Sequence, residues 1–156
     1  MLCNQVMCAP VQILTATDTV EAAARRMLEA NIGFLPVCNA VGAVTGVLTD
    51  RDIILRIVAP GLSPSVPVSD VMTREVVVCR PSNEFFVAQQ LMRERRVARV
   101  VCVDDAGRPV GVITLSDVVR HEDGFRLAKT VRSALEHHGE RPDGPPSRRL
   151  SGTRRT

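Results

Sequence analysis

The stretch GVLTDRDII, residues 46–54, occurs a second time as GVITLSDVV, residues 111–119, which lies 65 positions further along the chain. Around these stretches, residues 6–59 align with residues 71–124 without a gap, and 11 of the 54 aligned positions are identical. Random pairing of this composition would match about three or four positions. The chain therefore uses one structural unit twice.

Each unit shows the pattern of strand, helix, strand, strand and helix. In the first unit the expected strands are 11–14, 34–38 and 43–48, and in the second they are 76–79, 100–103 and 110–113. The first helix follows Thr17 or Asp18 as N-cap, and the second begins at Thr49; their counterparts are 83–95 and a helix from Ser116. On the first unit's helices the expected buried stripe consists of Val20, Ala23, Ala24, Met27, Leu28, Ile53, Ile54, Ile57 and Val58.

These elements divide the chain into two repeats, residues 6–60 and 69–124. Residues 61–68 are rich in Pro and Ser and form the expected linker. Residues 125–138 carry apolar side chains at helical spacing, which predicts an amphipathic C-terminal helix. The composition of residues 139–156, mainly Arg, Ser, Pro and Gly, predicts a disordered basic tail.

Charge and composition exclude several functions. The net charge is +3, and the tail's five Arg against Glu140 and Asp143 supply a surplus of three, so the body is neutral. Only 3% of residues are aromatic, which argues against a single-strand nucleic-acid binder. No apolar run approaches the roughly 18 residues of a membrane span. Residues 1–10 do not resemble a secretory signal, so we expect a cytoplasmic protein.

The chain has five cysteines and three histidines, and their spacing does not suggest a zinc site. Cys38, Cys79 and Cys102 lie in apolar runs and are expected to be buried, reduced thiols. Cys3 and Cys8 lie near a terminus expected to be flexible, and a redox role for them stays open. Because there is no nucleophile–base pair and no phosphate-binding loop, we expect a protein that is not an enzyme and requires no cofactor.

The two motifs, together with IGFLPV (32–37) and RVVCVDDAGR (99–108), resemble the CBS domain family over about residues 6–124. The resemblance implies an α/β (α+β) fold in which two βαββα repeats pack through their sheets with pseudo-twofold symmetry. It also implies two clefts, which in many members bind adenosine-containing ligands. Each cleft combines the segment before the first strand of one repeat with the T-x-x-D motif of the other.

By this resemblance, the motif carboxylate accepts hydrogen bonds from the ribose hydroxyls, and the hydroxyl at the helix start helps to hold phosphate. The side chains Arg51 and Ser116 share one motif position from which phosphate is within reach. The base would lie in an apolar slot. One predicted cleft consists of Met7, Pro10, Gln12, Val112, Thr114, Ser116 and Asp117, with Arg99 as an additional phosphate-binding candidate. The other consists of Met72, Glu75, Val77, Val47, Thr49, Arg51 and Asp52.

The two predicted clefts are unequal. Phe34 stands where the second repeat has Arg99, and Gln12 and Glu75 are polar at positions where adenine favours apolar contacts. We therefore expect the cleft with Asp117 to be the better site. The T-x-x-D spacing also fits a helix-capping box, which requires no ligand.

Two functions follow from this sequence. The first is a regulatory module that binds AMP, ADP, ATP or a related ligand and signals to an effector protein or through its own oligomer. The alternative is a ligand-free dimeric interaction scaffold with degenerate clefts. Both readings expect a homodimer.

Overall fold

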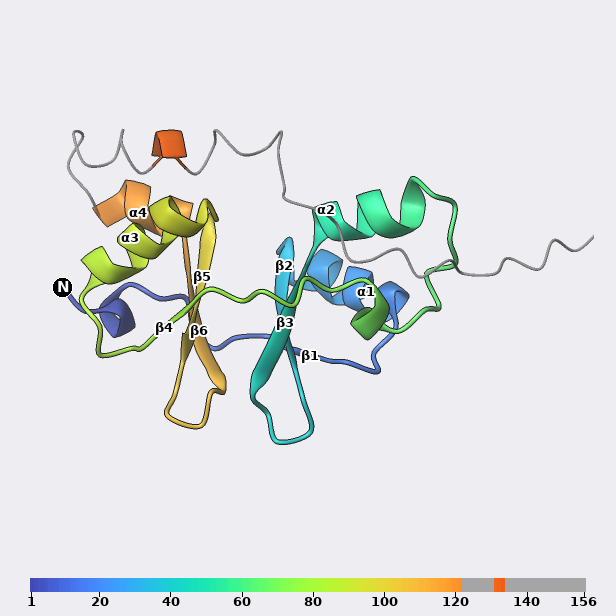
Figure 1. Ribbon diagram of the computed structural model, residues 1–156, viewed down its shortest axis with the longest axis horizontal. Coiled ribbons are helices and arrows are strands. Elements are labelled where there is room, and N and C mark those ends of the chain that lie inside the picture. Colours follow the sequence, from blue (N-terminus) through green and yellow to red (C-terminus); the bar gives the residue numbers. More distant parts are fainter. Residues whose placement is uncertain (122–130, 134–156) are drawn as a thin grey trace, which may run out of the picture.

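The computed structural model describes residues 1–121 and 131–133, and shows an α+β fold with two similar halves side by side (Figure 1). Each half has a three-stranded sheet, with the strand orders β1-β2-β3 and β4-β5-β6. The first half contains β1 (Leu14–Thr15), α1 (Val20–Ala30), β2 (Phe34–Cys38), β3 (Val44–Thr49), α2 (Asp50–Ile53) and the π-helical segment η2 (Ile54–Val58). The second contains β4 (Val78–Cys79), α3 (Phe85–Arg95), β5 (Arg99–Val103), β6 (Pro109–Thr114) and α4 (Leu115–His121).

The two sheets have the same register at an offset of 65 residues. In the first sheet β1 pairs parallel to β2, with Leu14 opposite Val37, and β2 pairs antiparallel to β3. The second sheet repeats this with Cys79 opposite Cys102. The first helix of each repeat also ends in the same way, at left-handed Asn31 and Arg96. The duplication seen in the sequence is therefore a duplication of backbone geometry.

The expected strand at 11–14 and the expected N-cap of the first helix were wrong. Only Leu14 and Thr15 pair with a neighbouring strand. The N-cap is Thr19, whose hydroxyl oxygen accepts a hydrogen bond from the Ala22 N–H at 3.2 Å. Asp18 closes the preceding turn instead, because its carboxylate accepts from the Thr15 N–H at 2.9 Å.

Three side chains of the expected buried stripe are exposed. Leu28 is 81% exposed, Ile54 55% and Val58 64%. In α1 the buried positions are Val20, Ala23 and Met27, and Leu28 lies about 100° around the helix from Met27. Beyond Ile53 the chain continues as the π-helix η2, of which only Ile57 is buried in the core.

The core of each half is completed by a segment that precedes the other half's first strand. The 3-10 segment η1 (Cys3–Gln5) lies against the second repeat, and Cys3 and Val6 belong to the core cluster around Phe85. Its counterpart η3 (Val68–Asp70) lies against the first repeat, where Val68, Val71 and Met72 join the cluster around Leu14. Figure 1 shows both segments crossing between the halves. The two repeats therefore interlock.

Two glycines let the crossing segments lie directly on the sheets. A Cβ atom at Gly46 would lie 2.6 Å from Met72 Sδ and 3.1 Å from the Thr73 carbonyl oxygen. At the equivalent Gly111, a Cβ atom would lie 2.6 Å from Met7 Cγ and would also overlap with Met7 Sδ. A side chain at either position would separate the crossing segment from the sheet.

Three buried thiols meet in the second repeat, and one of them corrects an expectation. Cys3, expected near a flexible terminus, is fully buried, and its N–H donates to the Asn83 carbonyl at 2.9 Å. The Cys79 Sγ lies 3.9 Å from that of Cys3 and 3.4 Å from that of Cys102. Burial raises the pKa of the Cys3 thiol to about 12. The hydrogen bond with Cys102 is the larger cause, and burial the second, of a raised pKa of the Cys79 thiol. Both thiols therefore stay protonated at neutral pH.

The predicted C-terminal helix over 125–138 and the predicted disordered tail over 139–156 lie outside the described residues, except that residues 131–133 are helical. Within the described part of the chain, no helix is both long and apolar enough to cross a membrane.

Replacing Gly111 by Ala should lower the free energy of unfolding by about 1–3 kcal/mol, because the new methyl group overlaps with Met7. In the double variant Met7→Ala/Gly111→Ala the overlap with Sδ and Cγ is removed. The loss should then be smaller than the sum of the two single losses. Urea unfolding of the four proteins measures this coupling, and strictly additive losses would show that the close approach is absent.

Cys8 is the exposed thiol, whereas Cys3, Cys38, Cys79 and Cys102 are buried. An aromatic disulfide reagent should therefore label one thiol per native chain rapidly and all five in denaturant. Cys8→Ser should remove the fast phase. A second fast thiol in that variant would contradict the buried cluster.

Candidate functional site

Two equivalent regions arise where a crossing segment pairs with the last strand of the opposite repeat. Thr73 and Val47 exchange two backbone hydrogen bonds, of 2.8 and 2.9 Å. Cys8 and Val112 exchange the equivalent pair, of 2.9 and 3.1 Å. The structure thus brings together the segments that the sequence analysis grouped, each next to the T-x-x-D motif of the other repeat.

In both regions the motif Thr and Asp hold each other at the start of a helix. The Asp52 Oδ2 atom accepts hydrogen bonds from the Thr49 N–H at 3.0 Å and from the Thr49 hydroxyl at 2.7 Å. The Thr49 hydroxyl oxygen accepts from the Asp52 N–H at 3.0 Å, which completes a capping box. Asp117 Oδ2 accepts the same two bonds from Thr114, at 2.8 and 2.7 Å.

Both carboxylates are buried, although the second is less so. Asp52 is 2% exposed and Asp117 8%. In each, the capping bonds occupy Oδ2 and the other oxygen, Oδ1, lies 3.5 Å from an arginine: Arg56 for Asp52 and Arg120 for Asp117. The Arg56 side chain is 21% exposed and that of Arg120 71%. The two carboxylates thus share one geometry but have different cationic neighbours.

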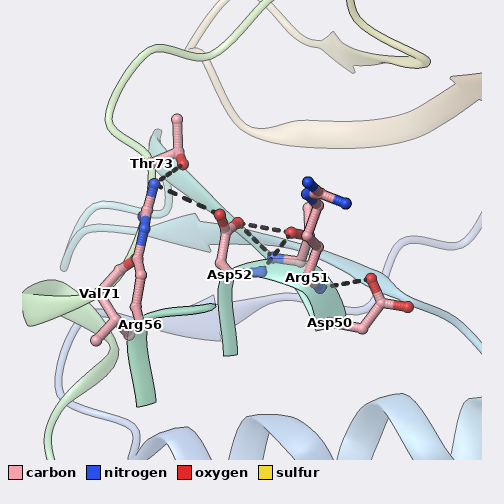
Figure 2. A network of polar contacts seen from close by, with 7 residues as sticks. Asp50, Arg51, Asp52, Arg56, Val71 and Thr73 are labelled. Atoms are coloured by element: carbon pink, nitrogen blue, oxygen red, sulfur yellow. Dashed lines mark hydrogen bonds and ion pairs between the residues drawn. The ribbon is translucent and has the colours of Figure 1, made fainter. Parts of the chain in front are cut away.

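Arg56 connects the first motif to the crossing segment, as Figure 2 shows. One guanidinium nitrogen, Nη1, donates to the Val71 carbonyl oxygen, and the other, Nη2, donates to the Thr73 hydroxyl at 3.2 Å. The same Nη2 faces Asp52. The sequence analysis missed Arg56, Val71 and Thr73 as site residues. The i, i+4 spacing of Asp52 and Arg56 in a helical stretch was the available signal.

Arg99 lies between the two halves. Its guanidinium carbon is 5.5 Å from the centre of the Phe34 ring, and the two residues occupy equivalent positions of the two repeats. In its own sheet Arg99 pairs with Thr114, and Phe34 pairs with Thr49. Equivalent residues in contact lie at the pseudo-twofold axis, so Arg99 is the strand partner of Thr114 in one motif and packs on Phe34, the strand partner of Thr49 in the other.

The remaining predicted site residues differ in how they are placed. Met7 and Met72 lie against Gly111 and Gly46. Val77 packs against the second repeat's core cluster, and its carbonyl oxygen accepts from the Val101 N–H at 3.0 Å. Glu75 forms a 3.5 Å ion pair with Arg95. The exposed predicted side chains are Pro10, Gln12, Arg51, Glu75 and Ser116.

No group of three or more His, Cys, Asp or Glu side chains in residues 1–121 and 131–133 is arranged to hold a metal ion.

The chain matches known proteins over nearly all of the described residues. The CBS domain profile matches residues 3–59 and 68–124. The CBS domain-containing protein YhcV of Bacillus subtilis is 33% identical over 134 residues, which cover 86% of this chain and 94% of YhcV. Hypoxic response protein 1 of Mycobacterium tuberculosis is 33% identical over 131 residues, which cover 83% of this chain and 91% of that protein.

Solved structures show the same architecture. The structure of Hypoxic Response Protein I, described with two coordinated zinc ions, superposes with a TM-score of 0.70 at 31% identity, over 79% of this chain and all of that one. CBSX2, described in complex with AMP, shares the fold at 24% identity and a TM-score of 0.65, over 76% of this chain and 93% of that one. The CBS domain pair of protein MJ0100, described with 5′-methylthioadenosine and S-adenosyl-L-methionine, also shares the fold. It is 24% identical with a TM-score of 0.69, over 77% of this chain and 94% of that one.

Two capped T-x-x-D motifs, each beside the crossing segment of the other repeat, thus coincide with two matches to one family profile. The chain belongs to the CBS domain family, as a pair of CBS domains.

Proposed function

We propose that the chain is a regulatory module that binds an adenosine-containing ligand between its two repeats and signals to an effector protein or through its own oligomer. AMP, ADP and ATP are the first ligands to test. The observation that carries the proposal is the pairing of each T-x-x-D motif with the crossing segment of the other repeat. A ligand that contacts both elements would stabilise one relative placement of the repeats.

The chemistry of the second motif supports this use. A carboxylate accepts hydrogen bonds from both hydroxyls of a ribose, and Asp117 still has Oδ1 facing a mainly exposed arginine. Thr114 donates to Asp117, the exposed Ser116 precedes it in the chain, and Arg99 pairs with Thr114 in the sheet, so these polar residues are the candidates for further ligand contacts. Adenosine compounds bound to CBS pairs with the same fold, CBSX2 and MJ0100, point to the same ligand class.

An interaction scaffold is the second candidate, because each T-x-x-D motif already satisfies its helix start without a ligand. Exposed apolar side chains on the helices would supply its binding surface: Ile54, Leu55 and Val58 in the first repeat, and Phe86 and Val119 in the second. Thermal unfolding separates the two functions, since a ligand at 100 times its dissociation constant adds about 2.7 kcal/mol to stability.

We also propose a homodimer in the cytoplasm. Ile54 and Val119 are equivalent positions of the two repeats, and α2, α3 and α4 lie along the same side of the molecule (Figure 1). A second copy would cover apolar surface of both halves at once. The five free thiols fit a reducing compartment.

Asp117→Ala should weaken binding of the adenosine ligand more than Asp52→Ala. A hydrogen bond to a charged group contributes about 1.5–3 kcal/mol, so the expected loss at Asp117 is roughly tenfold to a hundredfold in Kd. Both substitutions remove the same two cap bonds from their Thr, at a cost on the order of 1 kcal/mol. Asp52→Ala also leaves Arg56 without its carboxylate and should be the less stable variant, so the larger loss of binding expected for Asp117→Ala does not follow from stability. Calorimetric titration of both folded variants decides the matter, and an equal loss or a larger loss at Asp52 would refute the assignment.

Sedimentation velocity at micromolar concentration should show a dimer, and Ile54→Glu/Val58→Glu should convert it to a monomer because charges then replace apolar contacts. Val41→Glu is the matched control. Val41 is 77% exposed but lies in the turn between β2 and β3, away from the helices (Figure 1). A monomeric wild-type chain, or a control that also dissociates, would contradict the proposed surface.

A further inference from the structure

The Arg56 guanidinium is fixed by three groups from two repeats. It donates to the Val71 carbonyl and to the Thr73 hydroxyl, and Nη2 lies 3.5 Å from Asp52 Oδ1 (Figure 2). Thr73 is itself fixed by its two backbone hydrogen bonds to Val47. Arg56 therefore cannot leave Asp52 without breaking contacts to the crossing segment.

This arrangement competes with a ribose for Asp52. The capping bonds from Thr49 already use Oδ2, and Oδ1 faces the guanidinium while the Asp52 side chain is only 3% exposed. Ribose hydroxyls would have to displace a cation from a buried carboxylate, and the displaced guanidinium would remain near the core with one partner fewer. The donors of Arg56 are directed at these protein groups and therefore away from a ligand phosphate.

Among the described residues, the second repeat has no equivalent of the contacts that Arg56 makes with the crossing segment. The residue equivalent to Arg56 is His121, whose Nδ1 lies 2.8 Å from the Asp117 carbonyl oxygen and whose ring packs edge-on against Phe85. The cation beside Asp117 is Arg120, with a side chain that is 71% exposed. An exposed ion pair of this kind is weak and its arginine is free to rotate into solvent. Arg120 therefore opposes a ligand at Asp117 less than Arg56 opposes one at Asp52, and the Asp117 side chain is 11% exposed against 3% for Asp52.

We propose that Arg56 is the residue that closes the Asp52 site to ribose, so that the native chain has one competent adenosine site, at Asp117. The inference rests on the proposed ligand class and adds what determines the number of sites. Arg56 is a specificity-determining residue here: the same side chain that ties the first motif to the crossing segment excludes the ligand.

The test is calorimetric titration with AMP, ADP and ATP of the wild-type chain and of Arg56→Ala and Arg56→His, the latter carrying the residue of the second repeat. The wild-type chain should bind one nucleotide per chain, and each variant should bind two. The added site should be about tenfold to a hundredfold tighter than any second event in the wild-type chain. Adding Asp52→Asn to either Arg56 variant should abolish the added site. Circular dichroism checks that the variants fold.

Arg25→Ala is the matched control, because this arginine also pairs with a carboxylate four residues away but lies on α1, outside both motifs, and its removal should leave the count at one. A purely structural role for Arg56 predicts weaker or unchanged binding but never an additional site. The proposal is overturned if the wild-type chain already binds two nucleotides, or if both folded Arg56 variants bind no more than the wild-type chain.

Failure of the proposed function is a separate result. If the wild-type chain binds no nucleotide but an Arg56 variant binds one that depends on Asp52, the native ligand assignment fails and the role of Arg56 holds. If the wild-type chain and both Arg56 variants bind none, both are overturned.

Discussion

The exchange of crossing segments is the constraint on which the rest of the structure depends. Val6 and Cys3 complete the core of the second repeat, while Val68 and Val71 complete that of the first. Each half thus buries apolar surface only with a segment that the chain delivers from outside its own sheet and helices. Backbone pairing at Val47 and Val112 then fixes where each segment lies on its sheet. The relative placement of the repeats follows from this exchange rather than from a linker.

The same exchange brings chemistry-bearing groups together at the boundary. The glycine that opens each motif admits the methionine of the other repeat's segment, and the Thr and Asp at the motif's end cap the following helix. Phe34 and Arg99 occupy equivalent positions of the two repeats. They contact each other at the pseudo-twofold axis, because a twofold arrangement places equivalent residues opposite each other. The T-x-x-D motif therefore carries both the structural role and the proposed ligand-binding role. An Asp that caps its helix is compatible with both roles.

The duplication made most of the fold predictable. The pattern at offset 65 indicated β2, β3, β5 and β6 and the segments that would meet, because backbone constraints such as Gly46 and Gly111 recur in both copies. The first strand of each repeat was misplaced or predicted too long, since 11–14 is Leu14–Thr15 and 76–79 is Val78–Cys79 in the structure. Local signals failed where tertiary contacts decide. The N-cap of the first helix is Thr19 instead of Thr17 or Asp18. Leu28 and Ile54 are exposed, because the spacing of apolar residues does not show which side of a helix faces the core. The contacts of Arg56 also required coordinates, because Val71 and Thr73 are distant in sequence.

A duplicated fold leaves its two sites free to diverge only where the backbone does not depend on the side chain. The cap itself satisfies this condition, because it forms in both repeats, and positions 56 and 121 each follow the capping Asp by four residues. Beyond the cap the repeats differ, since Arg56 lies in the π-helical η2 and His121 in α4. Arginine reaches across to the crossing segment, whereas the shorter histidine packs on Phe85 within its own repeat. The residue four positions after the capping Asp can therefore give one site a structural contact and leave the other site open to a ligand, with the cap unchanged in both repeats.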